Sequence, residues 1–184
     1  MTDAPELHPL LAARWSPSTF DADHLASEAD AATLVEAARW APSAGNSQPW
    51  AFIVGRRGDE THVRLTAHLG GSSRQWVPTA SILVANLCHR FVEQTDWDYS
   101  EFALYDLGQA VAHMTIQAAA LGLAARQFRA FDRDGVAREF EVPEHWEVTT
   151  MTAFGRAPSP RPGRERRAPD ELRWNAAADV PGKP

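Results

Sequence analysis

Three segments of the chain carry residue types that bind polar ligands. The first runs from Arg14 to Phe20 and contains Trp15, Ser16 and Ser18. A guanidinium group donates a planar pair of charge-assisted hydrogen bonds, so Arg14 with the neighbouring hydroxyls can hold a phosphate. The alternative is an ordinary capped turn with one surface arginine. Taken alone, the segment favours that alternative.

The second segment runs from Ala41 to Trp50 and carries Pro42, Ser43, Asn46 and Gln48. Its hydroxyls, amides and flexible glycine can present hydrogen-bonding groups to a polar heterocycle or a polyol chain. Proline, serine, glycine and asparagine also favour an ordinary polar connecting loop. Composition alone does not separate these two interpretations.

The third segment is a proline- and arginine-rich stretch from Ala157 to Pro169, which we expect to form an extended arm. Its arginines Arg164, Arg166 and Arg167 can close on a phosphate, although such a run is more often a solvated charged surface.

Other kinds of site find little support in the sequence. Cys88 is the only cysteine, so the chain can form neither an internal disulfide nor a thiolate metal cluster. The seven histidines include no helical pair at metal-ligand spacing. There is no glycine-rich dinucleotide loop, no phosphate-binding P-loop and no G-x-S-x-G elbow. We therefore expect no metal.

Length and composition are those of one globular domain spanning residues 1–184. Apolar residues make up 44% and charged residues 23%, and the seven tryptophans suggest large buried contacts. The formal net charge of -6 argues against a general nucleic-acid binder. The N-terminus lacks an apolar signal core, and no apolar run is long enough to span a bilayer, so we expect a cytoplasmic protein without a membrane partner.

Hydrophobic periodicity predicts a mixture of helices and strands around these segments. Ser27 and Asp30 are candidate N-caps of a helix that Pro42 would end. Because helices and strands do not alternate regularly, the pattern favours an α+β fold. The expected elements are helices at 7–14, 27–40 and 102–123 and strands at 50–54, 81–85 and 148–154.

The predicted helix at 102–123 is apolar on more than one face. Its only formal charges are Asp106 and, at its entry, Glu101, and Gly122 provides a stop near its end. A helix apolar on several faces is normally buried on several faces. A chain of this size has little core to surround it, so part of the burial is expected to come from a second subunit.

Taken in order, the segments resemble the nitroreductase family of FMN-dependent oxidoreductases. Arg14–Phe20 resembles the family's R-x-S-x-[RK]-x-F element, and Ala41–Trp50 matches A-P-S-x-x-N-x-Q-P-W at every specified position. The sequence A-L-G-L at 120–123 and the basic arm complete the pattern.

The resemblance implies a three-layer α/β/α sandwich with a mostly antiparallel sheet and an intertwined homodimer that binds FMN at the interface. It places the FMN phosphate on the first element and the arm, and the flavin ring and ribityl chain on the loop at 41–50. It also implies that residues 127–131 meet the flavin from the partner chain. The implied FMN-binding residues are Arg14, Trp15, Ser16, Ser18, Pro42, Ser43, Asn46, Gln48, Ser73, Arg129, Ala130, Arg166 and Arg167.

Three departures from the family pattern bear on cofactor affinity. Ser18 replaces the second basic residue of the phosphate element, Ser73 stands where an asparagine is common, and Arg129-Ala130 replaces a glycine-rich turn. A charge-assisted hydrogen bond contributes about 1.5–3 kcal/mol, so we expect FMN to bind about one to two decades more weakly.

The implied activity is ping-pong hydride transfer in which NADH or NADPH reduces FMN and a small oxidised substrate, such as a nitroaromatic or a quinone, reoxidises it. The flavin carries this chemistry, and no side chain is assigned as a catalytic acid or base. One alternative is a specialised flavin dehydrogenase or dehalogenase, for which residues 91–100 would be a short lid. The other is a flavin-binding or degenerate dimeric protein of the same fold without NAD(P)H turnover.

Overall fold

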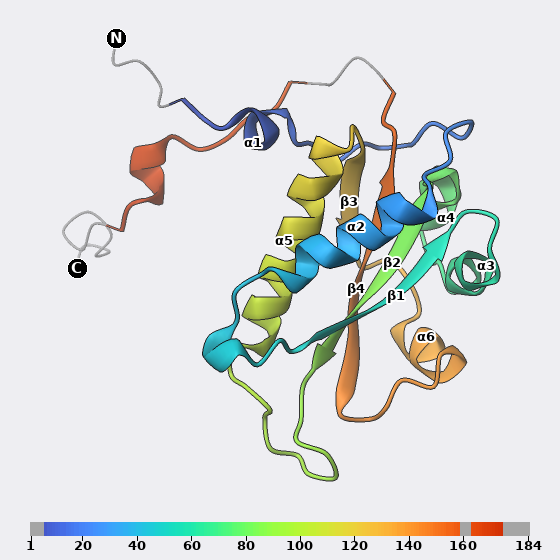
Figure 1. Ribbon diagram of the computed structural model, residues 1–184, viewed down its shortest axis with the longest axis vertical. Coiled ribbons are helices and arrows are strands. Elements are labelled where there is room, and N and C mark those ends of the chain that lie inside the picture. The colour runs from blue at the N-terminus through green and yellow to red at the C-terminus, as the bar shows by residue number, and fades with distance from the viewer. Residues whose placement is uncertain (1–5, 159–162, 175–184) are drawn as a thin grey trace, which may run out of the picture.

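A four-stranded sheet forms the centre of the computed structural model, which describes residues 6–158 and 163–174. Its strands are β1 (Trp50–Arg56), β2 (Ile82–His89), β3 (Ala124–Phe128) and β4 (Trp146–Gly155). They lie in the order β1-β2-β4-β3, and each neighbouring pair is antiparallel (Figure 1). Strand β2 is buried along nearly its whole length, which explains why its sequence is a continuous apolar run.

Helices cover both faces of this sheet. Helices α2 (Glu28–Arg39) and α5 (Ala103–Ala120) pack on one face, where Ile82 and Val84 join the core with Leu34 and Met114. Helices α3 (Glu60–Ala67) and α6 (Arg133–Glu139) pack on the other face. Successive β2 residues point to opposite faces, as the pleat requires. The expected three-layer α+β sandwich with an antiparallel sheet is confirmed.

The boundaries of α2 follow from its end residues. Ser27 is the N-cap, and its hydroxyl accepts a hydrogen bond from the backbone N–H of Asp30, whose carboxylate accepts one in return from the Ser27 N–H. The helix ends at Arg39, three residues before Pro42. The predicted helix is confirmed, with Ser27 as the cap and Asp30 inside the first turn.

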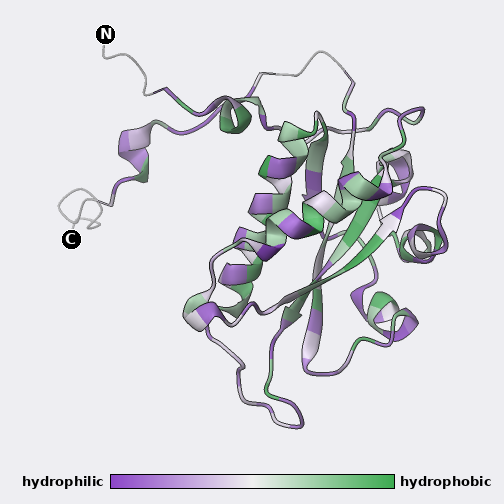
Figure 2. Cartoon of the chain, viewed as in Figure 1, coloured by the Kyte–Doolittle hydropathy of each residue, from purple (hydrophilic) through white to green (hydrophobic). Residues whose placement is uncertain are grey.

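Helix α5 is the longest element and ends where Gly122 adopts a φ of 72°, a conformation that glycine takes without steric cost. Leu107, Val111 and Met114 are buried against the sheet. Apolar residues dominate the central strands and this helix (Figure 2). No helix in the two described ranges is long and apolar enough to cross a membrane.

The short elements were harder to predict. Helix α1 (Pro9–Ala13) is shorter than the expected 7–14, while β1, β2 and β4 extend beyond the strands predicted. Strand β3 and helices α3, α4 (Ser73–Trp76) and α6 were not predicted. The remaining elements are the single 3₁₀ turns η1 (Ala44–Asn46), η2 (Val77–Thr79) and η3 (Pro169–Leu172).

Candidate functional site

A hollow of about 220 Å³ opens at the C-terminal end of α5. Arg14 and Trp15 border it from the segment after α1, and Thr115 and Ala119 border it from α5. The Arg14 guanidinium lies beside the hydroxyl of Ser16, with Nη1 3.3 Å from Oγ. The hollow thus offers one cation and one hydroxyl at a partly apolar surface, which suits the phosphate end of a larger ligand.

The segment that follows Arg14 is fixed by its backbone. Pro17 is buried, and its carbonyl accepts a hydrogen bond of 3.1 Å from Nη1 of Arg126 in β3. The Arg126 guanidinium also lies 4.2 Å above the ring of Trp76. Ser18 is exposed. This arrangement holds Arg14, Ser16 and Ser18 along one end of the sheet.

The loop at 41–50 has an unusual backbone. The backbone φ angle is positive at three positions of the loop: 59° at Gly45, 57° at Asn46 and 48° at Gln48. Positive φ angles are uncommon for residues other than glycine. The Ser43 hydroxyl accepts a hydrogen bond of 3.0 Å from the Gln48 N–H, which closes the loop on itself. Strained backbone of this kind concentrates where a protein binds ligands.

The loop is also tied to the body of the protein. Asp106, buried in the first turn of α5, accepts a hydrogen bond of 3.0 Å through Oδ2 from the Ala44 N–H. Pro42, Asn46 and Gln48 remain exposed. Within the described residues, the buried Oγ of Ser47 has no hydrogen-bond partner.

The hollow and the loop lie at opposite ends of α5 in one chain. Arg14 borders the last turns of the helix, whereas Ala44 is bound to its first turn (Figure 1). Thirteen residues separate Asp106 from Ala119, which corresponds to about 20 Å of helix at 1.5 Å per residue. The two groups of predicted FMN-binding residues therefore face different ends of the same subunit.

The turn at Arg129-Ala130 belongs to the same side of the chain as the phosphate element. The carbonyl of Ala130 accepts hydrogen bonds from the Gly70 N–H at 2.9 Å and from the Ser73 hydroxyl at 2.6 Å. Ser73 is 1% exposed, so its hydroxyl holds this turn instead of facing a ligand, which corrects its expected direct contact. Arg129 and Ala130 are themselves exposed.

The C-terminal arm passes α1 and continues away from the sheet (Figure 1). A guanidinium nitrogen of Arg164 donates to the carbonyl of Ala12. Arg166 donates to the carbonyl of its neighbour Glu165, and Arg167 lies beside Glu171 and Trp174 further along the arm. The described arm thus starts close to the phosphate element, but its two predicted ligands point elsewhere within this chain.

Comparison with known proteins gives a consistent result. A family model described as the nitroreductase family matches residues 11–80. A Streptomyces coelicolor protein named "Putative NADH dehydrogenase/NAD(P)H nitroreductase" is 29% identical, over 71% of this chain and 75% of that protein. The chain therefore resembles the nitroreductase family, over residues 11–80 of its sequence and over most of its fold.

Two solved structures show the same fold as this chain. One, described as an oxidoreductase containing FMN, has a TM-score of 0.77 and 26% identity, over 86% of this chain and 80% of that one. The other, a nitroreductase family protein from Streptococcus pneumoniae, has a TM-score of 0.77 and 21% identity, over 90% and 98% of the two chains.

Three contacts around the loop at 41–50 were missed by sequence reasoning. Asp106 anchors the loop, Tyr99 donates through its hydroxyl to the Ser47 carbonyl at 3.3 Å, and His89 stacks on the Tyr99 ring. Asp106 had a signal, because a single carboxylate inside an apolar helix must be paired when it is buried. Tyr99 and His89 had none, since only the fold brings them together.

Cysteine and metal chemistry find no support in the part of the chain that the structure describes. Cys88 is fully buried, and burial raises the pKa of its thiol to about 11, so it is not a nucleophile near neutral pH. No group of three or more histidine, cysteine, aspartate or glutamate side chains is placed to hold a metal within these ranges.

Proposed function

We propose that this chain is an FMN-dependent oxidoreductase that transfers hydride from NADH or NADPH to small oxidised molecules such as nitroaromatics and quinones. Its similarity to the nitroreductase family over residues 11–80 and its 26% identity to an oxidoreductase containing FMN support the flavin. The observation that carries the proposal is the pairing of a cationic hollow at Arg14 with an exposed, strained amide loop at 41–50.

The residues present fit an FMN molecule in two parts. Arg14 and Ser16 match the terminal phosphate, because a guanidinium and a hydroxyl supply charge-assisted donors. The exposed side chains of Asn46 and Gln48 match the polar ring edges and hydroxyls of the rest of the molecule. The hollow alone, at about 220 Å³, lies below the roughly 300–1,000 Å³ of typical ligand sites, so it requires a second wall.

We propose that a second copy of the chain supplies that wall. In a twofold dimer with antiparallel α5 helices, the N-terminal end of one helix lies beside the C-terminal end of the other. That pairing would bring the loop of one subunit to the hollow of its partner. An exposed apolar stripe at i, i+4 spacing on α5, with Leu104, Gly108 and Ala112, offers a surface for it.

This arrangement revises which segment crosses between subunits. Sequence analysis expected residues 127–131 to come from the partner. The bonds from Arg126 to Pro17 and from Ser73 to Ala130 join that segment to the side of the chain that carries Arg14. The segment that a partner would contribute is therefore the loop at 41–50, and Arg129-Ala130 would face the same FMN as Arg14.

The side chains of this site would bind and orient the reactants rather than move protons. Bound FMN would supply the redox chemistry, taking hydride from the nicotinamide and giving electrons to the acceptor. Arg129 would add positive charge beside the electron-rich reduced cofactor, and the exposed Asn46 amide side chain would donate to it. Successive use of one open surface by donor and acceptor gives ping-pong kinetics.

Absorption spectroscopy of the purified protein tests the proposal. We expect a yellow protein that releases FMN on denaturation and loses its visible absorbance when NADH or NADPH is added without oxygen. Quinone or nitroaromatic should then restore the absorbance. A protein that ignores added FMN would contradict the flavin assignment, and a yellow protein that stays oxidised would identify a binding protein instead of a reductase.

A further inference from the structure

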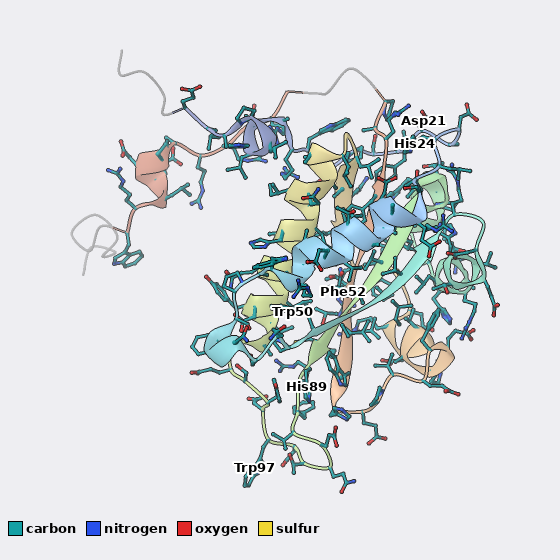
Figure 3. The ribbon with its side chains drawn as sticks, in the orientation of Figure 1. Asp21, His24, Trp50, Phe52, His89 and Trp97 are labelled. Carbon is teal, nitrogen blue, oxygen red and sulfur yellow. The ribbon has the colours of Figure 1, made fainter. Side chains whose placement is uncertain are left out.

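The His89 ring lies between two aromatic rings from different parts of the chain. Its centroid is 3.8 Å from that of Tyr99, with 18° between the planes, and 4.7 Å from that of Trp146, with 13° between the planes. His89 ends β2, and Trp146 begins β4. Figure 3 labels His89 near the end of the sheet from which the segment carrying Trp97 extends.

Tyr99 belongs to a hairpin formed by residues 91–100, which we call the hairpin. Backbone hydrogen bonds of 2.9 Å from Val92 to Trp97 and from Tyr99 to Arg90 define it. Residues 92–99 are all exposed, and the Trp97 side chain is 74% exposed. The hairpin therefore has little core of its own, and its position depends on the few groups that tie it to the sheet.

The histidine stack connects the hairpin to the proposed flavin loop. The His89 N–H donates to the Pro49 carbonyl at 3.1 Å, and the Tyr99 hydroxyl donates to the Ser47 carbonyl at 3.3 Å. Residues from β2, β4 and the hairpin thus meet at one end of the loop at 41–50. A change in the stack would directly alter the backbone of the loop at 41–50, which we propose binds FMN.

The surroundings of His89 favour a neutral imidazole. Within the described residues its buried Nε2 has no hydrogen-bond partner. A second N–H at that atom would be a buried donor without an acceptor, and it would bring a charge with it. The titratable and charged groups that face this cluster are Glu93, Asp98 and Tyr99 from the hairpin, Cys88 and Arg90 from the end of β2, and His145 and Glu147 from the start of β4.

We propose that His89 is a positioning residue whose neutral ring holds the hairpin against the loop at 41–50, and whose protonation releases it. This proposal rests on the proposed function in one respect, because the hairpin then controls how an electron acceptor reaches the flavin. We call this attachment of the hairpin to the loop at 41–50 the latch. It requires only the stack and the two hydrogen bonds to Pro49 and Ser47.

The direction of the pH effect follows from linkage. Burial, and then the neighbouring His145, lower the pKa of His89, while the Phe91 backbone and Glu93 raise it. The open form, with a pKa of about 6.5, binds more protons than the closed form below that pH. The closed hairpin is therefore favoured most above about pH 6.5 and is lost as pH falls towards the depressed value, by at most about tenfold per pH unit.

A second contact also ties the hairpin to the start of β4. His145 lies 3.6 Å from Glu93 on the hairpin. A His145→Gln variant removes this contact and leaves the stack in place. A His89→Phe variant keeps an aromatic ring between Tyr99 and Trp146 but cannot be protonated. The two variants separate the contributions of the two histidines.

Hydrogen–deuterium exchange of the full-length, FMN-loaded protein between about pH 5 and pH 8 tests the latch. After correction for intrinsic exchange, we expect hairpin amides of the wild type and of H145Q to lose protection below pH 6.5, by up to about tenfold per pH unit. The H89F variant should keep its protection throughout, and Tyr99→Leu should lose it at every pH. If Tyr99→Leu does not fold, the pH profile of H89F against wild type carries the test alone.

Either of two exchange results would overturn the latch: equal pH dependence in wild type and H89F, or protection that increases on acidification. The second is what cation–π attraction between an imidazolium and the two rings would produce. In steady-state assays at about pH 5.5, H89F should change KM for a bulky quinone relative to wild type. Failure of flavin reduction in all variants, with the exchange profile as expected, would contradict the proposed function and not the latch.

Discussion

The carboxylate of Asp106 and the backbone N–H of Ala44 are joined by a hydrogen bond of 3.0 Å between two elements 62 residues apart in the sequence. The second oxygen of the same carboxylate accepts a hydrogen bond of 3.3 Å from Gln109. Asp106 is 2% exposed, so both acceptor atoms are committed to holding the start of α5 and the loop at 41–50 together.

The Asp106→Asn variant should weaken this attachment, because an amide has one acceptor oxygen where the carboxylate has two, and it carries no charge. Leaving a buried donor unsatisfied costs about 1–3 kcal/mol, which we expect to see in the free energy of unfolding. FMN affinity should fall about tenfold, equivalent to about 1.4 kcal/mol, because the loop is no longer ordered before binding. Urea denaturation and titration of flavin fluorescence measure the two effects.

Glu101→Gln is the matched control for Asp106→Asn, since Glu101 is exposed just before α5. It should alter neither quantity. An Asp106→Asn protein that is less stable but binds FMN as the wild type does would show that the attachment has no part in cofactor binding.

The Arg14→Ala variant should distinguish FMN from riboflavin, which lacks the phosphate. Loss of a hydrogen bond to a charged group costs about 1.5–3 kcal/mol, so FMN affinity should fall about 10- to 100-fold while riboflavin affinity stays the same. Arg138→Ala is the control, because the Arg138 side chain is 74% exposed on the opposite face of the sheet. Equal losses for both flavins would place Arg14 away from the phosphate.

Ser27→Ala should destabilise the protein by about 1 kcal/mol, the usual contribution of an N-cap. Ser27 donates to Oδ2 of Asp30 through both its backbone N–H and its hydroxyl at 2.8 Å, and these bonds lower the pKa of Asp30. The carboxylate therefore contributes stability above its ordinary pKa, and this contribution is lost as pH falls through the lowered value.

Urea denaturation at several pH values should show that the difference between Ser27→Ala and wild type shrinks in acid below about pH 4. Ser72→Ala is the control, because Ser72 also precedes a helix but its side chain makes no capping bond. A difference that grows on acidification would contradict this assignment of the hydrogen bonds.

The longer elements could be predicted from the sequence because their signals are local. Ser27 with Asp30, the proline at 42 and the apolar face of α5 each act within a few residues. Strand β3, which includes Arg126, could not be read in this way, because five residues carry too little periodicity. Its existence depends on pairing with β4, which lies about 20 residues further along the chain.

The same distinction between local signals and tertiary contacts applies to the candidate site. The residue types at Arg14 and at 41–50 could be recognised as ligand-binding, but their placement at opposite ends of α5 is a property of the fold. Ser73 shows the limit most directly: its type and position suggested a ligand contact, whereas packing turns its hydroxyl toward the Ala130 carbonyl. Side-chain direction in short helices and turns is set by tertiary contacts that the sequence does not display.

Cys88 should react very slowly with thiol reagents in the folded protein. It is fully buried, and burial raises the pKa of its thiol from 9.0 to about 11. At pH 8 about one molecule in a thousand then carries the reactive thiolate, against about one in ten for an unperturbed thiol of that model value. Reaction with an aromatic disulfide reagent should therefore proceed at the rate of unfolding, and one thiol should react at once in denaturant.

Val92→Cys provides the internal control for this measurement, because Val92 is 42% exposed on the hairpin. The variant should show one fast thiol and one slow thiol in the native state. If the native protein without this substitution reacted within seconds, Cys88 would have to be reached through an opening of the sheet between β1 and α5. The burial that keeps the thiol protonated would then not describe the protein in solution.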